Sequence, residues 1–138
     1  MEQTTSKEEY FQHTIKKELA ISGAGIHTGQ SVTIRLKPAD TNTGIIFQRV
    51  DLPGKPIVKA DVDNVIETNR STTIEQNGAR ISTIEHIMAA LVGMEVDNVL
   101  IEIDGEEVPI LDGSAEPFIE AFEKIGAAKQ DAKKIYYS

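Results

Sequence analysis

A glutamate and a histidine stand side by side in the chain as Glu85 and His86. Zinc binds a neutral imidazole, and a neighbouring carboxylate can take a proton from an attacking water, so the pair could carry out metal-assisted hydrolysis. The glutamate also fits a structural role, because Ser82-x-x-Glu85 is the pattern of a capping box, which satisfies a backbone N–H group where a helix begins. His86 could likewise be a partly exposed surface histidine. The pattern favours capping and leaves both interpretations open.

Two glycine-containing loops could bring further polar groups to this pair. Residues 23–29 contain His27, but a β-branched strand follows them, where a dinucleotide-binding loop would be followed by a helix. A simple strand connection is therefore the plainer interpretation. Residues 109–115 contain Asp112 and Ser114 and are typical of a tight turn in which Ser114 caps the next helix. The sequence argues against a Ser-His-Asp triad of Ser114, His86 and Asp112, because Asp112 and Ser114 are too close in sequence to flank one imidazole.

The composition limits what the chain can bind. The 138 residues include 14 Lys and Arg against 22 Asp and Glu, and the net charge of −8 argues against nucleic acid as a partner. The sequence has no cysteine, which excludes disulfides and thiolate ligands, and its histidines are His13, His27 and His86. A three-ligand zinc site is therefore hard to complete within the chain. No apolar run has the length of a membrane span, and we expect a cytoplasmic protein.

The hydrophobic pattern predicts mostly extended structure with two late helices. Asn77-Gly78 predicts a β-hairpin, because both residues tolerate the positive φ angles of a type I′ turn. The expected strands are 15–21, 32–36, 44–50, 71–76, 79–82 and 98–103, the expected helices are 83–93 and 116–125, and 57–66 stays ambiguous. The stripe of the first helix that should face the sheet consists of Ile84, Ile87, Met88, Leu91 and Val92. This order predicts an α+β fold, a two-layer sandwich of mostly antiparallel sheet with two helices on one face.

Four separated blocks carry a resemblance to a known family. In chain order they are residues 25–29 (GIHTG), 80–91 (RISTIEHIMAAL), 97–98 (DN) and 109–115 (PILDGSA). Together they resemble the N-terminal half of UDP-(3-O-acyl)-N-acetylglucosamine deacetylase, the zinc amidase of lipid A biosynthesis. The blocks occur in the expected order, and the resemblance extends over residues 15–137.

The resemblance implies a fold, a cofactor and roles for four residues. The fold is that of the second domain of ribosomal protein S5, the cofactor is zinc, and the substrate is UDP-3-O-acyl-N-acetylglucosamine. His86 matches the single zinc ligand that the first half of the family contributes, and Glu85 matches the general base. His27 matches a histidine that lines the site, and Asp112 matches a loop aspartate whose role we leave open. Apart from the resemblance, Arg70 and Arg80 are candidate contacts for a diphosphate by charge alone, and an ordinary solvated arginine is the plainer interpretation of each.

One motif of the family is missing. Its other zinc ligands are a His and an Asp four residues apart, whereas the three histidines here are followed at that distance by Lys17, Ser31 and Ala90. We therefore expect a leader at 1–13, a deacetylase domain at 14–128, and at 129–138 a linker that opens a missing second domain. Such a fragment should be inactive alone. The alternative is a non-catalytic interaction domain that kept the fold and associates with itself through the exposed interdomain face.

Overall fold

The computed structural model describes residues 11–68 and 71–134. Its strands are β1 (Phe11–Ile15), β2 (Leu19–Ala24), β3 (Ser31–Pro38), β4 (Ile45–Arg49), β5 (Ile57–Lys59), β6 (Val65–Glu67), β7 (Thr72–Gln76), β8 (Ala79–Ser82), β9 (Val99–Ile103) and β10 (Ala127–Lys133). Its helices are the 3₁₀ helix η1 (Val62–Asn64) and the α-helices α2 (Glu85–Gly93) and α3 (Glu116–Ile125). The elements form the expected α+β fold.

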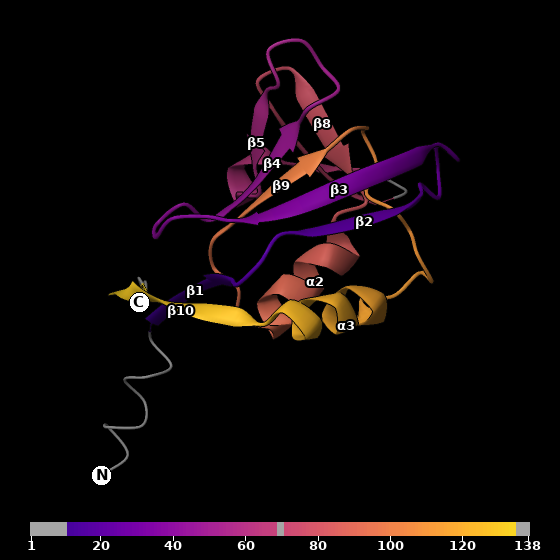
Figure 1. Ribbon diagram of the computed structural model, residues 1–138. Coiled ribbons are helices and arrows are strands. Elements are labelled where there is room, and N and C mark those ends of the chain that lie inside the picture. Colours follow the sequence, from indigo (N-terminus) through magenta and orange to yellow (C-terminus); the bar gives the residue numbers. More distant parts are fainter. Residues whose placement is uncertain (1–10, 69–70, 135–138) are drawn as a thin grey trace.

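A five-stranded sheet is the main layer, in the order β2-β3-β9-β4-β5. Its neighbouring strands run antiparallel except for β4 and β9, which are parallel. Helices α2 and α3 lie next to each other on one face of this sheet (Figure 1). In β3 the buried residues Val32, Ile34 and Leu36 alternate with more exposed ones, as the sequence predicts.

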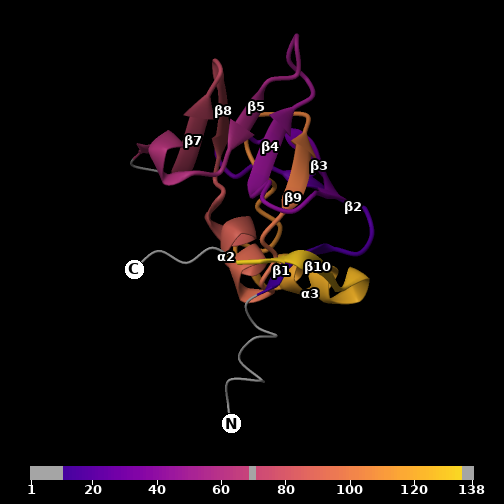
Figure 2. The same cartoon turned by 90° about the vertical axis from the view of Figure 1, so that its left-hand side faces the viewer.

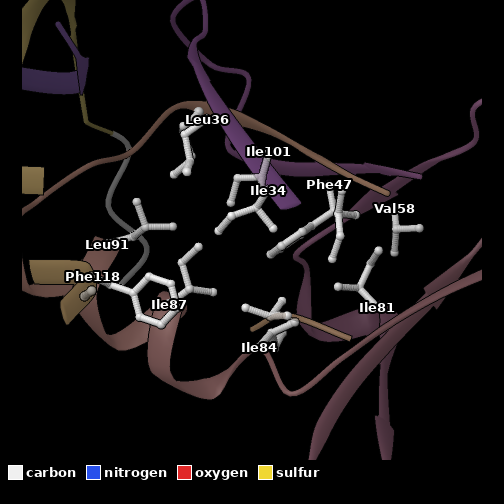
Figure 3. Close-up of a cluster of buried hydrophobic side chains, with 14 of the residues drawn as sticks. Ile34, Leu36, Phe47, Val58, Ile81, Ile84, Ile87, Leu91, Ile101 and Phe118 are labelled. Atoms are coloured by element: carbon white, nitrogen blue, oxygen red, sulfur yellow. The ribbon is translucent and has the colours of Figure 1, made fainter. Parts of the chain in front are cut away.

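The hydrophobic core fills the space between the sheet and the two helices. Figure 3 shows buried side chains of both layers turned toward one another, among them Ile34, Leu36, Ile101, Ile87, Leu91 and Phe118. The core continues through Phe47 and Val58 to Ile81 on β8. Helix α2 is thus fixed along its inner face by the sheet and by α3. The expected stripe of this helix is wrong at Val92, which is 69% exposed.

A second sheet, β6-β7-β8, lies next to β5 (Figure 2). The predicted hairpin is confirmed, because β7 and β8 pair antiparallel and Asn77 and Gly78 have φ angles of 56° and 78°. Side chains of the hairpin fasten it to β5: Gln76 Oε1 accepts from the N–H of Lys59 (2.9 Å), and Asn77 Nδ2 donates to the carbonyl of Ile57 (2.8 Å). Residues 57–66, left ambiguous above, contain β5, η1 and the start of β6.

The expected leader at 1–13 is wrong for its last residues. Phe11–Ile15 forms β1 and pairs antiparallel with β10, so residues 11–13 and 129–133 are strand. Residues 1–10 lie outside the described part, and the division into a domain at 14–128 and a following linker stays a prediction. The single strand expected at 15–21 is likewise divided, because β1 ends at Ile15 and β2 begins at Leu19.

Asn98 joins the β1-β10 pair to the loop before β4. Its amide nitrogen donates to Gln12 Oε1 (2.9 Å) and Gln130 Oε1 (2.8 Å), and its Oδ1 accepts from the N–H of Gly44 (2.8 Å). The residue is only 1% exposed, so water cannot easily replace these bonds. A polar network therefore holds these strands in place where the apolar pattern is weak.

We expect Asn98→Leu to lower the free energy of unfolding by about 2 kcal/mol, because three polar partners lose their bonds in a buried place. Urea unfolding followed by circular dichroism measures the change. Glu120→Gln on the exposed face of α3 is the control and should stay within about 0.5 kcal/mol of the parent chain. A loss as small as that of the control would contradict the structural role of Asn98.

Candidate functional site

The four site residues proposed from the sequence lie in one place. His27, Glu85, His86 and Asp112 line a pocket of about 480 Å³. They come from three separate segments: the loop after β2, the first turn of α2, and the loop before α3. The remaining lining residues are Ile26, Thr83, Ile110, Leu111 and Gly113. The fold thus gathers residues that are far apart in sequence around one opening.

Glu85 and His86 are the first two residues of α2, and both are partly exposed. The capping-box interpretation is wrong, because Ile84 occupies the N-cap position and Ser82 is the last residue of β8. The hydroxyl of Ser82 lies 3.4 Å from Glu106 Oε2. Glu85 Oε1 instead accepts from the N–H of Thr72 (3.2 Å), which fixes the carboxylate beside the pocket. The helix also begins at Glu85 and not at position 83 as expected.

A buried carboxylate that sequence reasoning missed holds the His27 loop. Glu107 is 2% exposed, and its Oε1 accepts from the N–H of Thr28 (2.9 Å). The N–H of His27 donates to Oε2 (3.0 Å), and the hydroxyl of Thr83 donates to the same oxygen (2.9 Å). Glu107 therefore connects the loop that carries His27 to the residues that precede α2.

These bonds decide the charge of Glu107. Burial by itself would raise the pKa of the carboxyl group, but the N–H groups of Thr28 and His27 and the Thr83 hydroxyl outweigh burial and hold the pKa below its usual 4.5. The group is therefore ionised at neutral pH. The sequence shows two adjacent glutamates, Glu106 and Glu107, and no local pattern tells the exposed one from the buried one.

Gly25 permits the close approach of the loop to this carboxylate. A Cβ atom at position 25 would collide with Glu107 Oε1 and would lie 2.8 Å from Thr28 Oγ1. The loop is closed by its own backbone, because the N–H of Gly25 donates to the carbonyl of Gln30 (3.0 Å) and the N–H of Gly29 donates to the carbonyl of Gly25 (2.9 Å). The glycine pattern of residues 25–29 thus serves a tight turn around an anionic side chain.

The loop before α3 is fixed by Asp112 and Ser114. Asp112 Oδ1 accepts from the N–H (2.9 Å) and the hydroxyl (2.7 Å) of Ser114. The Ser114 oxygen also accepts from the N–H of Glu116 (3.2 Å), so it supports the start of α3, although the N-cap position is Ala115. Ser114 and Asp112 bond to each other, which is a turn arrangement and not that of a triad.

The remaining sequence proposals lie outside this pocket. Arg80 lines a neighbouring pocket of about 310 Å³ and lies 3.7 Å from Glu75 in an exposed ion pair, while Arg70 is outside the described residues. His13 lies on β1, and its N–H donates to Asp97 (2.8 Å). Within residues 11–68 and 71–134, no three His, Asp or Glu side chains are grouped so that they could hold a metal ion. None of the described helices has both the length and the apolar character needed to span a membrane.

Comparison with known proteins identifies relatives over almost the whole chain. Residues 12–138 match the family UDP-3-O-acyl N-acetylglycosamine deacetylase. The UDP-3-O-acyl-N-acetylglucosamine deacetylases of Citrifermentans bemidjiense and Geotalea uraniireducens are 50% and 45% identical over 126 residues, which are 91% of this chain and 41% of each relative. The Bifunctional enzyme LpxC/FabZ of Bacteroides thetaiotaomicron is 45% identical over 126 residues, 27% of its length. The chain therefore spans about two fifths or less of these relatives.

The lowered pKa of Glu107 predicts a pH-dependent contribution to stability. The ionised carboxylate stabilises the folded state above the unfolded pKa of 4.5, and this contribution is lost as the pH falls through the lower folded value. We expect Glu107→Gln to cost about 1–3 kcal/mol at pH 7 and less at pH values below 4.

Urea titrations of both chains across this pH range measure the difference. Asp51, whose pKa the hydrogen-bonded Arg49 side chain lowers, titrates in both chains and cancels. A cost that does not change with pH would show that the charge of Glu107 does not stabilise the fold.

Proposed function

Because this chain belongs to the UDP-3-O-acyl N-acetylglycosamine deacetylase family, we propose that it contributes part of the active site of a zinc-dependent deacetylase. The substrate would be UDP-3-O-acyl-N-acetylglucosamine, the compound named by its relatives, and the reaction would be hydrolysis of the N-acetyl group in lipid A biosynthesis. The observation that carries the proposal is the pocket that His27, Glu85, His86 and Asp112 line together.

His86 is the residue of this chain that would hold zinc. Its side chain is partly exposed at the pocket and not buried among the core residues of α2, so the imidazole is accessible to an ion. The described residues fit the metal in part, because His86 lies at the pocket but no three donors of the described residues are grouped to hold an ion. The other ligands would come from polypeptide beyond this chain, as the family resemblance implies. When bound, zinc would act as a Lewis acid for the acetamide carbonyl and would acidify water.

Glu85 would act as the general base. Its carboxylate lies at the pocket directly before His86 and is held by the Thr72 N–H, so it can take the proton of a water that attacks the acetamide carbon. The C–N bond of the amide then breaks, the proton taken from the water passes to the departing nitrogen, and acetate and a free amine result. His27 and Asp112 would line the substrate space together with the first residues of α2. These roles agree with the residue types, and mutation of the pair tests them.

A hybrid enzyme tests the function. This chain replaces the matching 126 residues of the Citrifermentans bemidjiense relative, and acetate release from UDP-3-O-acyl-N-acetylglucosamine is measured. We expect the hybrid to be active, and Glu85→Gln to lower kcat by about 10²–10⁴-fold through loss of the base. His86→Ala should abolish turnover and lower the zinc content. The exposed α3 variant Glu120→Gln is the control and should keep the parent rate. A folded hybrid that contains zinc and whose kcat is unchanged by Glu85→Gln would contradict the assignment.

For the chain of 138 residues alone, we expect neither turnover nor one tightly bound zinc per molecule, because a catalytic zinc site takes three protein ligands. Metal analysis after gel filtration in micromolar zinc measures the content. One tightly bound zinc per chain that disappears in His86→Ala would overturn the proposal that the remaining ligands lie elsewhere.

A further inference from the structure

We propose that Glu107 is a positioning residue of the pocket, whose buried carboxylate fastens the His27 loop to the segment that begins α2. The donors that surround it come from two segments, the loop at His27 and Thr28 and the residue Thr83. These segments also supply His27, Glu85 and His86 to the pocket. The effect on the loop follows from geometry alone, and the effect on hydrolysis rests on the proposed function.

The backbone of Glu107 is itself held in place. The N–H of Ser82 donates to the carbonyl of Glu106 (2.8 Å), and the N–H of Val108 donates to the carbonyl of Ser82 (3.1 Å). The residues on both sides of Glu107 are thus bonded to the end of β8, immediately before the segment that leads into α2. The carboxylate therefore projects from a fixed backbone toward the His27 loop.

Thr83 shows why the carboxylate matters for the start of α2. Its φ angle is 62°, in the left-handed region that a β-branched residue rarely adopts. Its hydroxyl bond to Glu107 opposes relaxation of this strained backbone, two residues before Glu85. If the acceptor is removed, the strained segment and the loop lose their shared partner in a site that is almost closed to water. The His27 loop and the start of α2 should then move relative to each other.

Steady-state kinetics of the hybrid enzyme measure how Glu107 affects hydrolysis. We expect Glu107→Gln to lower kcat by about 10²-fold, because the reacting groups lose their alignment. Glutamine is nearly isosteric with glutamate, so the substitution removes the charge and keeps the shape. KM should change by less than about threefold, because Glu107 does not itself line the pocket with His86. Glu106→Gln is the matched control, an identical substitution at the adjacent exposed position, and should keep the parent kcat.

Hydrogen exchange of the 138-residue chain tests the loop contact without reference to activity. In Glu107→Gln the amide protons of His27 and Thr28 should exchange about tenfold faster, while those of β3 and β9 should keep their rates. Gly25→Ala should give the same local effect, since its Cβ atom displaces the carboxylate. Unchanged exchange at His27 and Thr28 in a folded Glu107→Gln chain would overturn the proposal.

If Glu107→Gln does not fold, a second pair of variants tests whether Glu107 positions the pocket. Thr83→Val removes one donor to the carboxylate and keeps the shape of the side chain, and Thr83→Ser restores the hydroxyl. We expect the valine variant to have the lower kcat and the serine variant to recover part of the loss. Equal kcat in the two variants would overturn the positioning role.

The two proposals can fail separately. If the parent hybrid releases no acetate, the proposed function fails, and faster exchange in Glu107→Gln would still support the loop contact. If the hybrid is active and Glu107→Gln exchanges faster but keeps the parent kcat, the positioning role is wrong and the deacetylase assignment stands.

Discussion

A buried, ionised carboxylate is the constraint on which the pocket depends. Glu107 is almost closed to water, so its charge must be satisfied by protein donors, and three of them approach it from two segments. The close turn at Gly25 and the left-handed backbone at Thr83 both lie against this carboxylate. Local features that look unrelated in the sequence thus meet at one charged group.

The hydrophobic core holds helix α2 in a fixed position. Ile87 and Leu91 pack α2 against the sheet and α3. The helix therefore keeps its position when polar groups contact its first turn. The loops that carry His27 and Asp112 leave the ends of well-packed elements and meet in front of that turn. Packing therefore sets the position of the helix, and the carboxylate of Glu107 sets the position of the loop relative to it.

The residue pattern alone predicted local features, whereas the four site residues, which come from three separate segments and line one pocket, followed from the family resemblance. The Asn77-Gly78 hairpin and the alternation in β3 follow from residues close together in the chain, and both are confirmed. Glu107 could not be found, because its donors His27 and Thr28 lie 80 and 79 residues away. The β1-β10 pair was missed for the same reason, since its polar residues show no period and its partner lies more than a hundred residues along the chain.

The proposed division of the metal site makes this rigidity necessary. A single imidazole from this chain would form only one of the bonds to zinc, so it would not gather the other ligands by its own affinity. His86 must already face an open pocket when the rest of the site arrives, because ordering the first turn of α2 at that moment would weaken binding. As the proposed base, Glu85 would have the same requirement, since a base one ångström out of place loses about 10²-fold in rate. Contacts within this chain, through Thr72 and Glu107, provide that order before any ion is bound.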